Sequence, residues 1–216
     1  WFAINSGLPS TNFMVRSLHL GEPLVDLMEV AGIIITGSPA YVTDEEIWNF
    51  TGAEYIKRAH KSGIPILGVC YGHQLLAWAF GGEVDFNIEG RKIGTVRIEL
   101  TKSAKDDLLF GELPDGFDVN VSHQQSVVRL PPDAVTLAVG SSDILQAFRL
   151  GDKTWGIQFH PEFSKEIIRE YIQARATEIR EEGLDPDELY DQASNTPNSV
   201  IIFQKFCQLV MNMRDC

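Results

Sequence analysis

Short hydrophobic runs and segments of helical periodicity alternate along the first part of the chain. Residues 30–37 and 64–69 are apolar at consecutive positions, which predicts two strands buried on both faces of a parallel sheet. Between them, Thr43-Asp44-Glu45-Glu46 has the form of a helix capping box, and Gly63 suits the position after a helix C-terminus. A second helix is predicted after the second run, ending at Gly81-Gly82. This order of strands and helices is typical of an α/β domain. The apolar positions of the first helix are Ile47, Phe50, Ile56 and Ala59.

The middle of the chain changes to an alternation of polar and apolar residues, as in strands with one solvated face. Residues 95–100 and 117–121 show this alternation, and residues 145–159 form the pattern of a β-hairpin around Gly151-Asp152. From Ser164 onward the pattern is helical, with a break at residues 183–186. We therefore expect a doubly wound, mostly parallel sheet flanked by helices, with a small antiparallel portion and a C-terminal helical extension over residues 164–216. The apolar residues of its last helix are Val200, Ile201, Phe203, Phe206, Leu209 and Val210.

Composition narrows the classes of function. The formal charge of −12 argues against a nucleic-acid partner, because phosphate binding needs clustered Lys and Arg. The longest purely aliphatic run, Ile33-Ile34-Ile35, is strand-sized, so no membrane partner is expected. The three cysteines, Cys70, Cys207 and Cys216, are too scattered for a disulfide framework or a zinc motif. We expect one domain over residues 1–216, in the reducing cytoplasm, with no metal and no other cofactor.

Gly68-Val69-Cys70-Tyr71-Gly72 carries the clearest chemical signal. It has the Gly-x-nucleophile-x-Gly form of a nucleophile elbow, and it stands between a predicted strand and a predicted helix, as that motif requires. Glycines on both sides allow the sharp turn that exposes the nucleophile, and the N-terminus of the following helix favours a thiolate. A buried structural cysteine is the alternative, but it accounts for neither glycine.

A nucleophilic cysteine needs a base, and the base needs an orienting partner. Of the five histidines, His123 and His160 stand at predicted strand ends. His160-Pro161-Glu162 directly follows the strand pattern of residues 154–159, and residues two apart project to the same side of an extended chain. Glu162 is therefore expected to hold the imidazole of His160. An ordinary strand end with two exposed polar residues is the alternative for this tripeptide taken alone.

Acyl transfer also needs an oxyanion hole. One donor is expected to be the backbone N–H of Tyr71, the residue after the nucleophile. The loop Thr36-Gly37-Ser38-Pro39 closes the preceding strand and is the candidate for the second donor. The local sequence of this loop is equally typical of a simple turn.

Three blocks, IIITGSP, GVCYGHQLLAWAFGG and GIQFHPEF, resemble the class I glutamine amidotransferases, most of all the glutaminase domain of GMP synthases and its stand-alone relatives. The segments VSHQQSV and GRKIGTVRIELT also fit, so the resemblance runs from Gly32 to Phe163. It implies a flavodoxin-like fold and a γ-glutamyl thioester that releases ammonia and is then hydrolysed to glutamate. It also implies roles for nine residues: Cys70, His160 and Glu162 as the triad, Tyr71 and Ser38 as oxyanion-hole donors, and Gly37, Gln74, Ser122 and His123 in substrate binding.

Several features depart from that family or leave its function open. Ser38 stands where GMP synthases usually have a second glycine, and no segment resembles their ATP-binding synthetase domain. The implied partners are glutamine or another γ-glutamyl compound, and a separate synthetase subunit that uses the ammonia. Residues 1–8 have the pattern of a helix end and residues 13–18 that of a strand, so we expect the family's first strand to be absent from the sequence.

Three other functions are alternatives to glutamine hydrolysis. A γ-glutamyl peptidase would use the same triad with an amine as the leaving group, and the sequence does not separate the two. A non-catalytic binding module would be expected to have lost a triad residue, and none is lost. A metal hydrolase using His123 and His160 would need clustered ligands, and the sequence offers no such motif.

Overall fold

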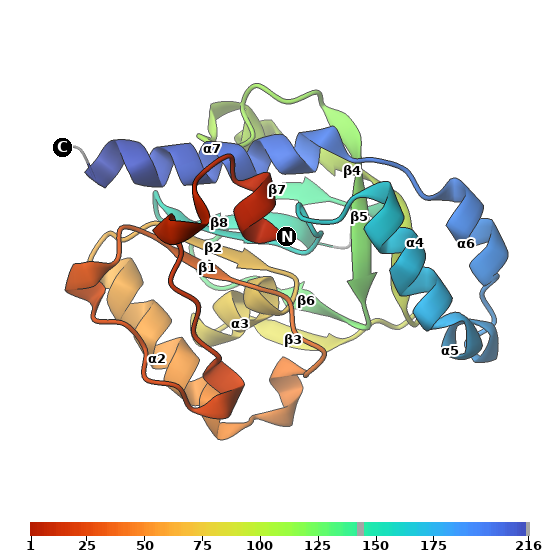
Figure 1. Ribbon diagram of the computed structural model, residues 1–216, viewed down its shortest axis with the longest axis horizontal. Coiled ribbons are helices and arrows are strands. Elements are labelled where there is room, and N and C mark those ends of the chain that lie inside the picture. Colours follow the sequence, from red (N-terminus) through yellow and green to blue (C-terminus); the bar gives the residue numbers. More distant parts are fainter. Residues whose placement is uncertain (142–144, 215–216) are drawn as a thin grey trace.

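A seven-stranded sheet forms the centre of the computed structural model, which describes residues 1–141 and 145–214 (Figure 1). Its order is β1-β2-β9-β8-β7-β4-β5, and a two-stranded sheet of β3 and β6 lies apart from it. The strands are β1 Ile33–Ile35, β2 Ile66–Val69, β3 Glu83–Phe86, β4 Lys92–Leu100, β5 Gly116–His123, β6 Gln125–Arg129, β7 Val135–Val139, β8 Leu145–Leu150 and β9 Thr154–Ile157. The α-helices are α1 Phe2–Asn5, α2 Ile47–Lys61, α3 Tyr71–Ala79, α4 Lys165–Ala174, α5 Ala176–Glu181, α6 Pro186–Gln192 and α7 Pro197–Arg214.

The parallel part of the sheet holds the two strands predicted from continuous apolar runs. β1 pairs in parallel with β2, and β2 pairs in parallel with β9. All four residues of β2 are buried, as expected for a strand covered on both faces. The remaining four pairs are antiparallel, and they include the predicted 145–159 hairpin as β8 and β9. The α/β class is confirmed, and the antiparallel portion extends further than the sequence indicated.

Helices cover both faces of the sheet and form two cores. α2 and α3 lie on one face, where Ile56 and Leu75 pack with Ile66 of β2 (Figure 1). α7 crosses the other face, where Phe203 and Phe206 pack in the cluster that contains Leu67. Adjacent residues of β2 thus belong to opposite cores, because successive side chains of a strand point to opposite faces.

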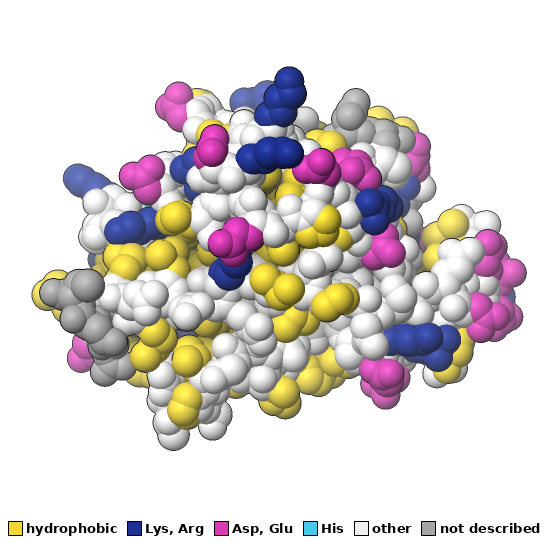
Figure 2. All heavy atoms as spheres, turned by 90° about the horizontal axis from the view of Figure 1, so that it is seen from above, with side chains coloured by type: hydrophobic (Ala, Val, Ile, Leu, Met, Phe, Trp, Pro, Cys, Tyr) yellow, Lys and Arg dark blue, Asp and Glu magenta, His cyan; other side chains and the backbone are white. Residues whose placement is uncertain are grey.

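The helices α4 to α6 form a separate unit at one side of the sheet (Figure 1). Ile168, Ile172 and Ile179 are fully buried there with Ile93 of β4. Ser164 caps α4, and Asp185 caps α6 after the predicted break at Gly183, so the helical extension is confirmed. Seen from the side of α7, acidic, basic and hydrophobic side chains are interspersed on the surface (Figure 2). No helix in the described ranges has both the length and the hydrophobicity needed to cross a membrane.

The start of α2 differs from the prediction. Thr43 lies in a 3₁₀ turn, Val42–Asp44, and the residue before the helix is Glu46, so the predicted capping box does not cap α2. Glu45 has a left-handed backbone (φ 49°) that separates the turn from the helix. At the other end Gly63 (φ 73°) follows the helix as predicted.

One prediction about a strand in the first part of the chain was wrong. The first helix carries Ile47 and Phe50 as predicted, and these two side chains are 83% and 48% exposed. Residues 13–18 form no strand in the structure. Met14 and Val15 are exposed, and a strand needs a neighbouring backbone to pair with. Only the helical character of residues 1–8 is found, as the short helix α1.

Candidate active site

Cys70 stands in a sharp turn between β2 and α3. Its backbone angles, φ 53° and ψ −103°, lie in a region that non-glycine residues rarely occupy. Gly68 and Gly72 allow this turn for a steric reason. A Cβ on Gly68 would overlap the carbonyl group of Gly72, and a Cβ on Gly72 would overlap the carbonyl oxygen of Ile35. The elbow predicted from the sequence is therefore present, and it leaves the Cys70 side chain at the end of the strand.

The imidazole of His160 lies beside Cys70 and is held by Glu162. The Nδ1 atom of His160 is 2.8 Å from Oε1 of Glu162, and both side chains are buried. The ring of Phe163 stacks on the imidazole, with 4.0 Å between centroids and 9° between planes. The backbone N–H of His160 donates to the carbonyl oxygen of Asn120 in β5, at 2.8 Å. The ring is thus fixed at one nitrogen and on one face, and its other nitrogen is left for Cys70.

The pKa values of the two histidines at strand ends, His160 and His123, are shifted in opposite directions. Burial by itself would lower the pKa of His160, but the charges of Cys70 and Glu162 and hydrogen bonds to both raise it to about 10. His123 also lies in the site, but burial lowers its pKa to about 4. Its Nδ1 is 2.8 Å from the carbonyl oxygen of Gln125, so Nδ1 carries the proton of the neutral ring. At neutral pH the ring of His160 is therefore an imidazolium, and the ring of His123 is neutral.

The loop after β1 lies close to Cys70 and His160. A Cβ on Gly37 would lie 2.9 Å from Cε1 of His160 and 3.6 Å from Cβ of Cys70. The hydroxyl of Ser38 accepts a hydrogen bond from the backbone N–H of Ala40 at 3.1 Å, which holds the loop in a turn. Tyr71 is the first residue of α3, so its backbone N–H has no acceptor within the helix. The side chain of Tyr71 points elsewhere, because its hydroxyl bonds to Asn49 at 2.6 Å.

All nine predicted site residues line one cavity of about 630 Å³. Gln74 forms part of its wall and donates from Nε2 to the carbonyl oxygen of Gln125 at 2.8 Å. The carbonyl oxygen of Ser122 is 3.8 Å from the sulfur of Cys70. Three buried atoms of residues that line the cavity have no hydrogen-bond partner among the described residues: Nε2 of His123, Oε1 of Gln125 and Oε2 of Glu162. These three unpaired acceptors suit a ligand that carries N–H groups.

Sequence reasoning missed residues that position the site. Asn120 is fully buried, and its side-chain amide donates to the carbonyl oxygens of Phe163 and Ser194 while accepting from the hydroxyl of Thr95. It therefore ties β5 to the segment that carries His160. In the sequence Asn120 occupies a polar position of an alternating strand, like the exposed Asp118, so the local pattern carries no signal of its burial.

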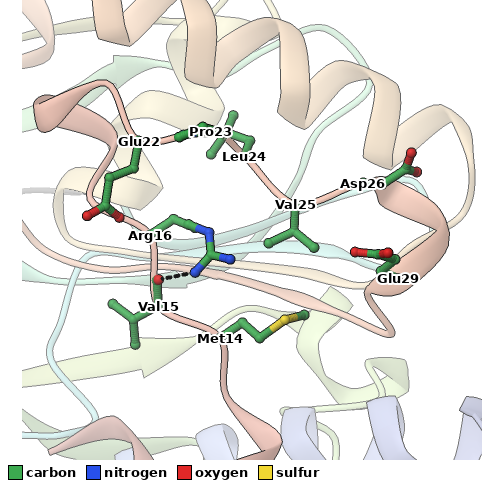
Figure 3. A pocket seen from close by; sticks show the side chains of 9 residues that line it. All are labelled: Met14, Val15, Arg16, Glu22, Pro23, Leu24, Val25, Asp26 and Glu29. Atoms are coloured by element: carbon green, nitrogen blue, oxygen red, sulfur yellow. Dashed lines mark hydrogen bonds between the residues drawn. The ribbon is translucent and has the colours of Figure 1, made fainter.

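A second cavity, of about 560 Å³, lies in the N-terminal segment (Figure 3). Arg16 bends back to the carbonyl oxygen of Val15, and Glu22, Asp26 and Glu29 are the acidic residues of the wall. None of the described residues that line it is a cysteine, serine or histidine. Within the described ranges, no group of three or more His, Cys, Asp or Glu side chains is arranged to hold a metal ion.

Comparison with known proteins agrees with this geometry. Residues 6–177 match the family described as glutamine amidotransferase class-I. The chain is 39% identical over 139 residues to a glutamine-hydrolysing GMP synthase of Porphyromonas gingivalis, covering 63% of this chain and 26% of that protein. It thus spans about a quarter of the length of the GMP synthases it matches first. Gamma-glutamyl peptidase 3 of Arabidopsis thaliana is 30% identical over 190 residues, which cover 85% of this chain and 75% of the peptidase.

Solved structures share the fold. A glutamine amidotransferase from Methylobacillus flagellatus superposes with a TM-score of 0.78 over 99% of this chain and 87% of its own, at 23% identity. A glutamine amidotransferase from Thermotoga maritima gives a TM-score of 0.71 over 91% of this chain and 84% of its own, at 24% identity. These likenesses support the architecture described above.

Proposed function

Because the chain belongs to the class-I glutamine amidotransferase family, we propose that it hydrolyses the γ-amide of glutamine to glutamate and ammonia through a γ-glutamyl thioester on Cys70. The observation that carries this proposal is the meeting of a strained cysteine elbow with a histidine that is held at 2.8 Å by a carboxylate. A buried structural cysteine would need neither the strain nor the charged partner. The whole chain would then act as one glutaminase domain.

The reaction begins with a thiolate at Cys70 and a proton on His160. The sulfur attacks the γ-carbonyl carbon, and the negative charge that develops on the carbonyl oxygen is stabilised by the backbone N–H groups of Tyr71 and Ser38. His160 then donates its proton to the amide nitrogen, the C–N bond breaks, and ammonia leaves. Glu162 keeps the imidazole in the orientation and the tautomer that this transfer requires.

Hydrolysis of the thioester runs the same groups in the opposite direction. The neutral His160 removes a proton from water, and the resulting hydroxide attacks the thioester carbonyl carbon. The C–S bond breaks, glutamate leaves, and the thiolate–imidazolium pair is restored. Gln74, Ser122 and His123 also line the cavity, and beside them we place the α-amino and α-carboxylate ends of glutamine.

A separate synthetase subunit is the proposed consumer of the ammonia. The chain corresponds to about a quarter of the glutamine-hydrolysing GMP synthases it matches, so an ammonia-using partner would have to come from elsewhere in the cell or in a longer chain. Binding of such a partner would be expected to raise the rate of glutamine cleavage.

A γ-glutamyl peptidase is the second candidate, and the comparisons give a specific reason to keep it. The similarity to a plant γ-glutamyl peptidase extends over 75% of that protein, whereas the similarity to GMP synthases covers a quarter of theirs. The thioester chemistry is the same in both cases, and the leaving group is an amine in place of ammonia. The shape of the cavity beyond His160 decides between the two.

The test is glutamate release from glutamine and, separately, from a γ-glutamyl peptide, with Cys70→Ala as the inactive variant. Cys207→Ala is the matched control, because Cys207 is a residue of α7 that lies in the core, where burial raises its pKa to about 11. Release that is lost in Cys70→Ala and kept in Cys207→Ala would support the proposed nucleophile. Release that persists in Cys70→Ala would overturn it.

Thiol alkylation gives a second, independent readout of the same proposal. Cys70 paired with an imidazolium is expected to react with iodoacetamide well before Cys207. The third cysteine, Cys216, lies outside the described residues. Equal rates at Cys70 and Cys207 in the folded protein would contradict an activated nucleophile.

A further inference from the structure

One wall of the active-site cavity is a row of rings in contact that starts at the imidazole of His160. Phe163 stacks on His160 at 4.0 Å, and the ring of Tyr171 packs against Phe163 with 4.7 Å between centroids. The guanidinium of Arg175 lies over the Tyr171 ring, 4.8 Å from its centroid. Phe163, Tyr171 and Arg175 all line the cavity. The row therefore leads from the imidazole of His160 to the guanidinium of Arg175, a residue that lies between α4 and α5. Figure 1 shows where these two helices meet.

The two arginines that line the cavity differ in whether their guanidinium groups are already paired with a carboxylate. Arg91 is paired, because its guanidinium donates two hydrogen bonds, of 2.8 and 3.0 Å, to the carboxylate of Glu182. Among the described residues, no carboxylate lies within ion-pair distance of Arg175. Among the described residues that line the cavity, Glu162 is the one carboxylate; its Oε1 is paired with His160, and its buried Oε2 has no partner there. On a protein of formal charge −12, a cavity wall with two guanidiniums and one carboxylate favours an anionic ligand.

The position of His160 determines which part of a substrate reaches Arg175. The leaving group must lie within hydrogen-bond reach of His160, because that imidazole supplies its proton. A leaving group larger than ammonia therefore extends over the wall that begins at Phe163. We place the glutamyl part beside Gln74 and the unpaired acceptor of His123, which line the same cavity. A cavity of about 630 Å³ has room for both parts.

We propose that Arg175, whose guanidinium lies over the ring of Tyr171, binds a carboxylate on the leaving group, so that the preferred substrates are γ-glutamyl peptides whose leaving amine belongs to an amino acid or short peptide with a free carboxylate. A guanidinium 4.8 Å from the centroid of an aromatic ring can still present N–H groups to a carboxylate. This inference rests on the proposed Cys70 chemistry and selects the peptidase candidate over a glutaminase that releases ammonia. No covalent step is added, because the C–N bond that breaks is the γ-glutamyl bond already described.

Two other roles for Arg175 make different predictions. If it bound the α-carboxylate of the glutamyl part, every γ-glutamyl substrate would lose the same factor when the residue is changed. If it served only to hold Tyr171 in place, the loss would not depend on whether the leaving group carries a charge. A pair of substrates that differ only in the carboxylate of the leaving group separates these roles from the proposed one.

The experiment compares kcat/KM for γ-glutamylglycine and for γ-glutamylglycinamide, in which that carboxylate is an amide. The protein is expected to favour γ-glutamylglycine by roughly tenfold, and Arg175→Gln is expected to remove most of that preference. Arg180→Gln is the matched control, because Arg180 is an exposed arginine of α5 that pairs with Asp187 at 3.4 Å and does not line the cavity. It makes the same change in net charge and is expected to keep the preference.

An unchanged ratio of the two kcat/KM values in Arg175→Gln would overturn the proposal, as would the absence of any preference in the unmodified protein. Failure of the chemistry is distinguishable from failure of this subsite. If no glutamate is released from any substrate, the affinity of Cys70→Ala for the two ligands, measured by calorimetry, still decides the inference. Tighter binding of γ-glutamylglycine that is lost in the double variant Cys70→Ala/Arg175→Gln supports it, and equal binding of both ligands refutes it.

Discussion

Gly37→Ala tests how closely the loop Thr36-Gly37-Ser38-Pro39 constrains the position of the His160 imidazole, the proposed base. A Cβ at this position would lie 2.9 Å from Cε1 of His160, whereas ordinary contacts begin near 3.4 Å. The imidazole or the loop would have to move by about 0.5 Å, the difference between these two distances. Since a displacement of about 1 Å costs on the order of a hundredfold in rate, half of that is expected to lower kcat by roughly tenfold.

The same substitution is expected to leave the fold intact. No left-handed backbone angle is required at Gly37, so alanine introduces no strain of its own. Substitutions on half-exposed loops usually change stability by less than about 0.5 kcal/mol, which corresponds to a melting-temperature change of about 2 °C or less in a protein of this size. Glutamate release and thermal unfolding are the two measurements. Gly140→Ala is the control, because a Cβ there would meet its nearest neighbour, Gln146, at 3.4 Å.

The outcome depends on the comparison of the two measurements. Normal kcat with a normal melting temperature in Gly37→Ala would refute the reasoning, because it would mean that the loop does not constrain His160. A melting temperature that falls in step with kcat would show that the loop supports the fold, and the catalytic argument would lose its basis. A slower reaction of Cys70 with iodoacetamide, without loss of stability, would be the expected accompanying result.

Three further outcomes are expected. The pKa of His160 is raised to about 10 in the folded protein, so the stability that its charged form contributes is present at neutral pH and is lost as pH rises through about 10. In Glu162→Gln this loss is expected at lower pH, which NMR titration of the imidazole ring detects. Glutamate release by the same variant is expected to fall by roughly tenfold or more. Burial lowers the pKa of His73 to about 3 and of His123 to about 4, so the free energy of unfolding is expected to fall as pH drops below about 6.5, by roughly 1 kcal/mol per pH unit for each group, and His73→Phe should show a shallower fall in denaturant titrations. Asn120→Ala leaves several buried partners unpaired and is expected to lower the free energy of unfolding by about 2–4 kcal/mol, whereas an unchanged unfolding midpoint would contradict its role in holding the His160 segment.

The elements nearest to the nucleophile were predictable from the sequence because their constraints are local. A strand buried on both faces must be apolar at every position, which marked residues 64–69. Gly68 and Gly72 were recognisable because a side chain at either would collide with backbone only a few residues away or in the adjacent strand. His160 and Glu162 were paired by their spacing alone, since two residues apart on an extended segment reach the same side. These are properties of a few consecutive residues.

The tertiary structure decided what depends on residues far apart in the chain. The segment 13–18 has the composition of a strand, but it lies where no described backbone pairs with it. Asn120 looked like one polar residue in a strand, and only the fold brings it under the His160 segment. Nothing in the local sequence shows whether Arg91 or Arg175 has an ion-pair partner. The packing of α4 to α6 gives Arg91 a carboxylate and leaves Arg175 on an aromatic ring at the cavity, because the partner of a charged side chain is chosen by three-dimensional proximity and not by sequence spacing.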